Sequence, residues 1–465
     1  MAARWTDEQQ KAIDLRHCNI LVSAAAGSGK TAVLVERIFS MLADTRHPLN
    51  IDNLLVVTFT NAAAAEMKER VEDRLAKSLD EDLDNDHVAR QLASIHSAQI
   101  MTIHSFCLYV IRNHFNEIDL DPAFRIGEET ELKLLRGDVA RELMEARYET
   151  DDPAFLEFVE CFAKGKMDEG IEELILQVYE YSRSYPSPTD WLCGCLDSFR
   201  VSCGDELEAL PAVKFLKGYV RQLIEELKRT VASALALCRE SDGPVYYEEM
   251  LLGDEKQIGQ LEACQSFDDY CHALSGLSFA PLSRKKMPEA SEMKKEQVKN
   301  MRAFVKDTLS RLKDDYFSVD GATAAGQLNR MLPHMEMLVS LVNEFALKYQ
   351  EAKEIKNMVD FGDLEHFALK ILTKYEDGQF VPTDAALELS KQYEEILIDE
   401  YQDSNQVQET ILGSISRERA GNPNIFMVGD VKQSIYKFRL AKPELFMEKY
   451  KSYPAMDEKY QRIEL

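Results

Sequence analysis

The sequence carries too few basic residues to form a generally cationic surface. Acidic residues outnumber basic ones by 81 to 55, which leaves a formal net charge of −26 at pH 7. This balance excludes a protein that binds nucleic acid through a positive charge spread over its whole surface. Any contact with a nucleic-acid strand would therefore need a local cluster of cations or aromatic rings.

Long hydrophobic runs and a disulfide pattern are also missing. No apolar run approaches the roughly 18 residues that span a bilayer, and the first residues, Met-Ala-Ala-Arg-Trp, lack the positive-then-apolar order of a secretory signal. We therefore expect no membrane partner. The nine cysteines are an odd number in a long chain, which favours a reducing cytoplasm. Three of them cluster, with a spacing that suits zinc poorly: Cys193, Cys195 and Cys203.

The clearest motif that is present is a strand, a loop and a helix start near the N-terminus. The apolar run from Ile20 predicts a buried strand, and a helical pattern follows the loop. Backbone N–H groups of such a loop and the dipole of its helix bind phosphate. In this motif Lys30 reaches the β- and γ-phosphates of a nucleotide, and Thr31 holds Mg²⁺. The general pattern has a glycine where this sequence has Ala24. The expected phosphate-binding residues are Ala24, Ala25, Ala26, Gly27, Ser28, Gly29, Lys30 and Thr31.

Four further apolar runs have the length of buried strands. They cover residues 54–58, 99–102, 396–398 and 424–428. Together with the first run they make five strands joined by helical patterns. This order predicts an α/β protein with a parallel sheet flanked by helices, whose ligands bind at the carboxyl ends of the strands.

The middle of the sequence has a different character. From residue 130 to residue 355 strand signals are few, and apolar residues repeat at helical spacing. We therefore expect a large all-α insertion domain of residues 119–370. It would interrupt a sheet domain made of residues 1–118 and 371–465.

Two of the late strands run directly into polar residues suited to phosphoryl transfer. Asp399 could hold Mg²⁺ opposite Thr31, and Glu400 could act as the general base for an attacking water. Gln433 adds a polar amide on the expected γ-phosphate side. The chemistry of these side chains predicts hydrolysis of a nucleotide bound at the sheet edge.

Aromatic and basic residues alternate directly after Gln433. Within residues 432–439, two rings, Tyr436 and Phe438, lie among three cations. Bases stack on such rings for about 1–3 kcal/mol each, and cations follow the phosphate backbone. The segment favours single-stranded nucleic acid as a ligand, although both rings could instead belong to a core.

These ordered motifs resemble the N-terminal part of superfamily-one DNA helicases of the UvrD/RecB group, and within that group the AddA family of helicase/nuclease subunits. The matching stretches are residues 5–13, 24–31, 58–67, 102–106, 399–405 and 428–446. Alanine at position 24 is normal for this group. The resemblance implies a RecA-like P-loop motor domain, called 1A, with the helical insertion as its accessory domain 1B.

The resemblance also implies a role for each matching position. Gln9 would read the adenine edge of ATP. Gln433 would sense the γ-phosphate and couple it to DNA, while Lys30, Asp399 and Glu400 keep the roles given above. Phe438 stands where relatives often have tryptophan. The residues implied to lie along single-stranded DNA are Thr58, Phe59, Asn61, His104, Ser105, Tyr436, Phe438 and Arg439.

For the whole protein the resemblance implies an ATP- and Mg²⁺-dependent helicase subunit in the bacterial cytoplasm. It would move three-prime to five-prime on single-stranded DNA, meet the duplex junction, and work with an AddB-like second subunit in double-strand break repair. Relatives continue past a strand like residues 460–465 into arginine-bearing motor motifs and a nuclease domain. We therefore expect an N-terminal fragment that hydrolyses almost no ATP alone.

Two other functions stay open, and two other patterns need an interpretation. The protein could be a solitary UvrD-like repair helicase, or a nucleotide-gated DNA-binding module, although a pure binding module would not need Glu400 as a base. Residues 360–363 contain the Asp-Phe-Gly sequence of the metal-binding motif of protein kinases. No kinase catalytic loop accompanies them, so we interpret them as structural. The basic run of residues 284–306 could be a solvated helix face or a track for duplex DNA.

Overall fold

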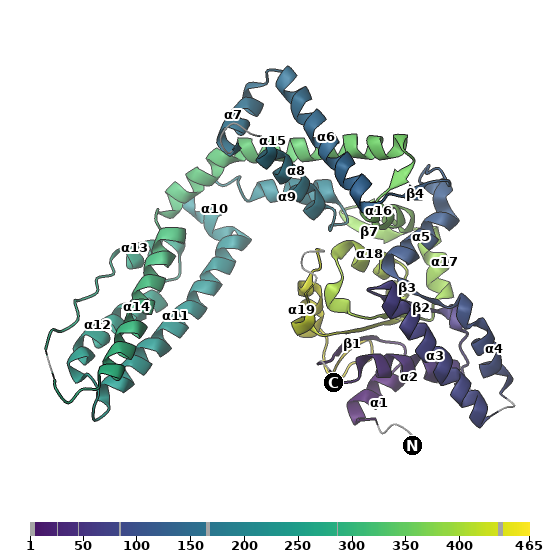
Figure 1. Cartoon of the computed structure of the whole chain (residues 1–465), viewed down its shortest axis with the longest axis horizontal. Coiled ribbons are helices and arrows are strands. Elements are labelled where there is room, and N and C mark those ends of the chain that lie inside the picture. Colours follow the sequence, from purple (N-terminus) through teal and green to yellow (C-terminus); the bar gives the residue numbers. More distant parts are fainter. Residues whose placement is uncertain are drawn as a thin grey trace. The chain divides into compact units, whose positions relative to one another are not determined.

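The computed structural model describes residues 5–25, 27–44, 46–82, 85–163, 168–285, 287–435 and 440–465. The chain forms two compact units (Figure 1). The first comprises Met1–Trp191 and Ser340–Leu465, and the second comprises Leu192–Val339. In the described residues, no helix combines the length and the apolar character needed to cross a membrane.

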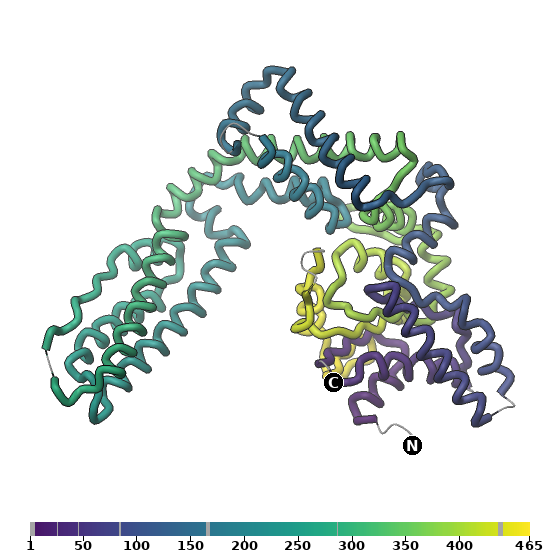
Figure 2. The backbone as a smooth tube through the Cα atoms, in the orientation of Figure 1, coloured from purple at the N-terminus to yellow at the C-terminus, as the bar shows by residue number. Residues whose placement is uncertain are grey.

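The first unit is built on a six-stranded parallel sheet. Its strands are β1 (Asn19–Ser23), β2 (Leu54–Thr58), β3 (Gln99–Thr102), β8 (Glu395–Ile398), β9 (Ile425–Gly429) and β10 (Tyr460–Glu464). They lie in the order β10-β1-β9-β8-β2-β3, and every neighbouring pair is parallel. The predicted α/β class with a parallel sheet is therefore confirmed. In Figure 2 the yellow C-terminal strand lies beside the purple N-terminal segment, as the pairing of β10 with β1 requires.

Helices cover both faces of this sheet (Figure 1). Successive strand residues point to opposite faces, so Ile20 and Leu54 face one core while Leu21 and Leu55 face the other. Because each strand is buried on both faces, its sequence is a continuous apolar run. One face carries α1 (Asp7–Asp14), α2 (Lys30–Leu42), α3 (Asn61–Glu81) and α4 (Asp86–Ser94). The other carries α5 (Ile103–His114), α16 (Phe361–Leu372), α17 (Asp384–Gln392), α18 (Gln406–Ser414) and α19 (Pro443–Ser452).

The strand register places the ends of five strands at one edge of the sheet. Ser23, at the end of β1, pairs with Gly429, at the end of β9. Thr58 and Thr102, at the ends of β2 and β3, pair with each other, and β8 lies between β9 and β2. Because all these strands are parallel, the loops that follow them gather at the same carboxyl edge. All the predicted motifs except residues 5–13, which precede β1, begin at or directly after one of these strand ends.

The rest of the first unit is mostly helical. Its longer helices are α6 (Glu129–Glu149), α7 (Pro153–Phe162) and α8 (Glu169–Ser182). Two more helices, α9 (Pro188–Asp197) and α15 (Gly321–Ile355), contribute residues to both units. The short strands β4 (Arg125–Ile126) and β5 (Met358–Val359) pair in parallel, and β6 (Thr373–Glu376) and β7 (Gln379–Pro382) form an antiparallel hairpin.

The second unit contains helices and no strand within residues 192–285 and 287–339. They include α10 (Gly204–Ala209), α11 (Pro211–Arg239), α12 (Glu248–Glu262), α13 (Phe267–Ser275) and α14 (Glu292–Tyr316). Apolar residues at helical spacing, such as Val220, Leu227 and Val305, form its core. The unit lies inside the range 119–370 expected for the insertion, whose domain boundaries stay a prediction.

Acidic partners surround much of the basic run in this unit. Arg302 is buried and donates to Asp254 with an Nε–Oδ2 distance of 2.5 Å. Lys294 pairs with Glu240 and Asp242. These pairs neutralise the charges that a duplex backbone would need, so the structure favours the interpretation of the run as a helix face.

Candidate functional site

The loop between β1 and α2 has the backbone shape of a phosphate-binding turn. Gly27 and Gly29 have φ angles of 79° and 85°, which glycine adopts without steric cost. Helix α2 begins at Lys30, so Lys30 and Thr31 lie in its first turn, where backbone N–H groups have no partner within the helix. An anion at this helix start would accept from those groups.

The surroundings of Gln9 and Ser28 are compatible with a ligand at the loop. The Gln9 amide donates to the Ser28 carbonyl oxygen at 3.0 Å, which brings the predicted adenine reader against the loop. The Ser28 hydroxyl is shielded from solvent and has no hydrogen-bond partner among the described residues. A buried hydroxyl left without a partner costs about 1–3 kcal/mol. A phosphate oxygen would supply the missing acceptor, so these residues fit a nucleotide. Ala26 lies outside the described residues.

The acidic turn after β8 lies next to this loop. The Lys30 ammonium is 3.7 Å from a carboxylate oxygen of Glu400. Glu400 has a φ angle of 52°, a left-handed conformation that non-glycine residues rarely adopt. The backbone N–H of Asp399 donates to the carbonyl oxygen of Val57 at 2.9 Å, which fixes the turn to the end of β2. The structure therefore brings the predicted metal ligand and base to the same sheet edge as the phosphate loop.

The electrostatics of the turn suit a divalent cation. Burial, and then the negative charge of Glu400, raise the pKa of Asp399 to about 6. A bound cation would reverse this shift by favouring the ionised form. In the described residues no three His, Cys, Asp or Glu side chains form a metal cluster. A cation here would depend on Asp399, the Thr31 hydroxyl, and ligand or water oxygens, the coordination that Mg²⁺ prefers.

Gln433 completes the arrangement around Lys30. Its side-chain oxygen accepts from the Lys30 ammonium at 3.3 Å, and its amide nitrogen donates to Asp430 at 2.8 Å. Asp430 is itself buried at the end of β9. The predicted catalytic residues Lys30, Glu400 and Gln433 thus come together from three different strand ends.

Gln402 is a residue that the sequence reading missed. It is buried, donates to Glu400 at 2.7 Å and accepts from the backbone N–H of Asp430 at 3.0 Å. A Cβ atom at Gly429 would lie 2.2 Å from the Gln402 side-chain oxygen, so a larger residue there would displace the Gln402 side chain. Gln402 therefore links the acidic turn to the loop that carries Gln433. The one available signal was its place inside the run Asp-Glu-Tyr-Gln-Asp.

A cavity of about 650 Å³ runs from the acidic turn to the loops after β2 and β3. Thr58, Phe59 and His104, three of the predicted DNA residues, line it together with Asp399 and Glu400. The Thr58 hydroxyl donates to the Thr60 carbonyl oxygen at 3.1 Å, so part of its role is to shape the turn.

The other predicted DNA residues have different positions. Asn61 is exposed in the first turn of α3, and the Ser105 hydroxyl bonds with that of Thr102 at 2.9 Å. Neither lines the cavity. Tyr436, Phe438 and Arg439 lie outside the described residues.

Phe361 is a second residue that the sequence reading missed. Asp360 and Asp363 are structural, as expected, because they cap the start of α16 and pair with the buried Lys353. Phe361 differs from them: it is 55% exposed and lines the cavity, with its ring centroid 5.1 Å from that of His104. A large apolar residue in the first turn of a helix was the available signal.

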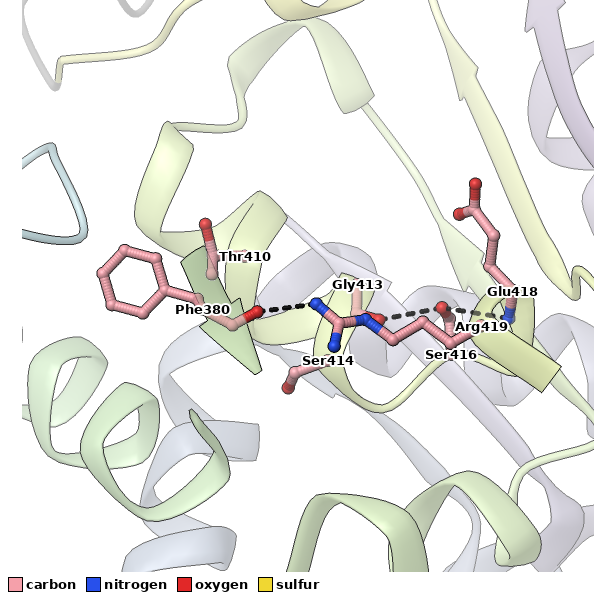
Figure 3. A pocket seen from close by; sticks show the side chains of 7 residues that line it. All are labelled: Phe380, Thr410, Gly413, Ser414, Ser416, Glu418 and Arg419. Carbon is pink, nitrogen blue, oxygen red and sulfur yellow. Dashed lines mark hydrogen bonds between the residues drawn. The ribbon is translucent and has the colours of Figure 1, made fainter. Parts of the chain in front are cut away.

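A smaller cavity of about 350 Å³ lies beside the end of α18 and the β6–β7 hairpin (Figure 3). Arg419 donates to the Phe380 carbonyl oxygen at 2.7 Å. The hydroxyls of Ser414 and Ser416 donate to backbone carbonyls of their own turn. Its polar groups are thus already bonded, and it shares no lining residue with the larger cavity.

The fold and this edge define a class: an α/β protein whose parallel strands end at a site suited to a phosphorylated ligand. The sequence matches the family of the UvrD/REP helicase N-terminal domain over residues 5–454. The chain therefore belongs to that family.

Relatives named as the A component of an ATP-dependent helicase/nuclease match nearly the whole chain. The one from Lachnoclostridium phytofermentans is 50% identical over 99% of this chain and 34% of its own length. Those from Clostridium beijerinckii and Geobacillus thermodenitrificans are 42% and 43% identical, over 99% and 97% of this chain and 37% of their own lengths. The chain thus spans about a third of the length of these relatives.

Proposed function

We propose that this chain is the ATP-binding part of a DNA helicase subunit that couples ATP hydrolysis to movement along single-stranded DNA. One observation carries the proposal. Lys30, Glu400 and Gln433 meet at one sheet edge, with distances of 3.7 Å and 3.3 Å from the Lys30 ammonium. A cavity leads from this point to Phe59 and His104. Membership of the UvrD/REP family supports the same function.

The nucleotide roles follow from the positions of the side chains. Gln9 binds the adenine edge, residues 24–31 hold the phosphates, and Thr31 with Asp399 holds Mg²⁺. Bound Mg-ATP supplies the phosphoryl group that is transferred to water. Glu400 takes the proton of that water, and the Lys30 ammonium stabilises charge on the phosphates. The whole assembly is a RecA-like P-loop motor domain.

Gln433 is the residue best placed to report the state of the nucleotide. Its amide contacts Lys30 on one side and Asp430 on the other. When a γ-phosphate binds Lys30, Gln433 must share or exchange that contact, and the segment of residues 430–435 moves with it. This segment leads directly into residues 436–439, which carry the predicted stacking rings. Gln433 thereby couples the nucleotide to DNA.

The DNA strand passes over the loops after β2, β3 and β9. Phe59, His104 and Phe361 lie at the cavity, where aromatic faces can stack with bases. The full set proposed to contact DNA is Thr58, Phe59, Asn61, His104, Ser105, Phe361, Tyr436, Phe438 and Arg439.

The wider assignment depends on the relatives. Their name describes a component of a helicase/nuclease, which favours a complex over a solitary repair helicase. We assign to the whole protein three-prime to five-prime movement, double-strand break repair with an AddB-like second subunit, and a place in the bacterial cytoplasm. Residues 119–370 form the accessory domain 1B, inserted into a motor domain of residues 1–118 and 371–465.

A test of the proposal is to separate binding from hydrolysis with Glu400→Gln in the full-length protein. The variant removes the base but keeps the size of the side chain, so it should bind Mg-ATP and single-stranded DNA normally and hydrolyse ATP at least about 100-fold more slowly. Hydrolysis is measured as DNA-stimulated phosphate release. An unchanged rate would contradict the assignment of Glu400. A wild-type protein that binds Mg-ATP and DNA but releases no phosphate would instead favour a nucleotide-gated binding module over a motor.

A further inference from the structure

Glu365 on α16 is a buried carboxylate that joins two separate segments of the site. Its side chain is 7% exposed. One oxygen lies 3.2 Å from the His104 ring nitrogen and accepts from the Gln408 amide at 2.7 Å. The other accepts from the Asn405 amide at 3.2 Å. Burial alone would raise the pKa of Glu365, but the hydrogen bonds from His104, Gln408 and Asn405 favour the carboxylate and lower it below the usual value. Glu365 is therefore ionised and binds three side chains at once.

The first of these segments is the one proposed to contact DNA. His104 lies in the first turn of α5, directly after β3, and lines the cavity. Phe361, one helical turn before Glu365, has its ring against that of His104. The His104 ring is thus in contact with both Glu365 and Phe361, and a DNA strand that moves the ring must move the Glu365 contact too.

The second segment is the acidic turn of the nucleotide site. Asn405 is the N-cap of α18, where its side-chain oxygen accepts from the backbone N–H of Gln408 at 2.9 Å. It follows Asp399, Glu400 and Gln402 within the same short segment. Because the cap fixes where α18 begins, it also fixes the end of the acidic turn. A displacement of Asn405 therefore shifts the turn that carries Glu400.

From these contacts, and on the basis of the proposed function, we infer that Glu365 is a positioning residue. It couples the His104 loop, which contacts DNA, to the Asn405 cap of the acidic turn, which contacts the nucleotide. Binding of single-stranded DNA then changes nucleotide affinity through Glu365, and by linkage nucleotide changes DNA affinity by the same factor.

Glu365→Gln should break this coupling while it keeps the volume of the side chain. A glutamine has one acceptor oxygen and one NH₂ donor, so it cannot accept from His104, Asn405 and Gln408 together. Asn405 cannot rotate its amide to compensate, because its oxygen is used in the cap of α18. One donor must therefore lose its partner, and the two segments lose their common contact.

The test measures the affinity of a fluorescent non-hydrolysable Mg-ATP analogue with and without oligo(dT) single strand. The ratio of the two affinities is the coupling factor, which for two coupled sites is typically about 5–150-fold. In Glu365→Gln this factor should fall to within about twofold of unity, while nucleotide affinity without DNA stays unchanged. In a His104→Ala background, Glu365→Gln should cause no further loss, because both changes remove the same link.

Controls separate the possible failures. Glu388→Gln, at an exposed position of α17, should leave the coupling factor at its wild-type value. A Glu365→Gln protein with wild-type coupling would overturn the inference alone. A variant that loses melting temperature and nucleotide affinity together would show a purely structural role, which also overturns it. A wild-type protein that binds neither probe would overturn the proposed function and the inference with it.

Discussion

The side chains of Lys30 and Gln433 meet at 3.3 Å although 403 positions separate them in the sequence. Lys30 starts the helix after β1, and Gln433 follows β9, the neighbouring strand in the sheet. The pairing of Ser23 with Gly429 sets this distance, because it aligns the two strand ends. Under the proposed function, a change in the contacts of Lys30 would be passed to the segment that leads to residues 436–439.

Lys30→Ala should remove nucleotide binding and leave the fold intact. The side chain is close to Glu400 and Gln433 and contributes the main positive charge at the loop, so its loss leaves phosphate charge and the acidic turn facing each other. We expect Mg-ATP affinity to fall at least about tenfold, or 1.4 kcal/mol, and ATP-driven unwinding by the full-length protein to stop. Lys133→Ala, at an exposed position of α6, is the matched control. Unwinding by the Lys30→Ala protein would contradict the loop assignment.

Asp399→Asn should stabilise the ligand-free protein relative to wild type, and this difference in stability should grow as the pH rises. The pKa of Asp399 is raised from 3.8 to about 6 in the folded state, so folding takes up a proton between these values and stability falls with increasing pH. This shift corresponds to about 3 kcal/mol. Asparagine carries no charge, so the free energy of unfolding of the variant relative to wild type should rise by about 2–3 kcal/mol from about pH 4 to about pH 7.

Chemical denaturation at a series of pH values measures this difference. The exposed Asp307, on α14, provides the control: Asp307→Asn should show no such trend. The same Asp399→Asn protein should gain less melting temperature from Mg-ATP than wild type does, because it lacks the carboxylate for the cation. A pH-independent difference would mean that the Asp399 charge is balanced in the ligand-free protein.

Local sequence patterns were sufficient to predict five of the six strands of the sheet and the positions of most motifs at their ends, because each strand, turn and helix start is encoded within a few residues. The pattern did not include β10, which pairs with β1 at the edge of the sheet. Lys30, Asp399 and Gln433 were found in this way. The partners of Glu365 could not be found, since His104 and Asn405 reach it from opposite directions along the chain, and no short pattern records that meeting. Phe361 was interpreted with its capping neighbours, although only the structure shows that its ring leaves the core.

Phe361→Ala should weaken single-strand binding with little loss of stability. The ring is 55% exposed, so its truncation removes little buried area, but it removes a stacking face beside His104. We expect a loss of about 1–3 kcal/mol in affinity for oligo(dT), measured by fluorescence anisotropy. Phe215→Ala serves as control, because Phe215 is even more exposed, at 79%, and belongs to the second unit. Equal losses for both variants would indicate nonspecific DNA binding by exposed aromatic rings and would contradict the proposed DNA path.

Lys353→Met should destabilise the first unit strongly. Lys353 is fully buried near the end of α15, and its ammonium pairs with Asp360 at 3.1 Å and with Asp363. Methionine preserves the volume but leaves the buried Asp363 and the partly exposed Asp360 without this cation. Among the described residues, the remaining cation paired with Asp363 is Arg183, at 3.1 Å. Removing one partner of a buried ion pair typically costs about 3–5 kcal/mol. Lys348→Met, one turn earlier and 40% exposed, should cost less than about 1 kcal/mol.

Because Asp360 and Asp363 fix the start of α16, the Lys353→Met protein should also lose DNA affinity before it unfolds in denaturant, as Phe361 and Glu365 lose their common support. Simultaneous loss of DNA binding and folding would show instead that the start of α16 has no local stability of its own.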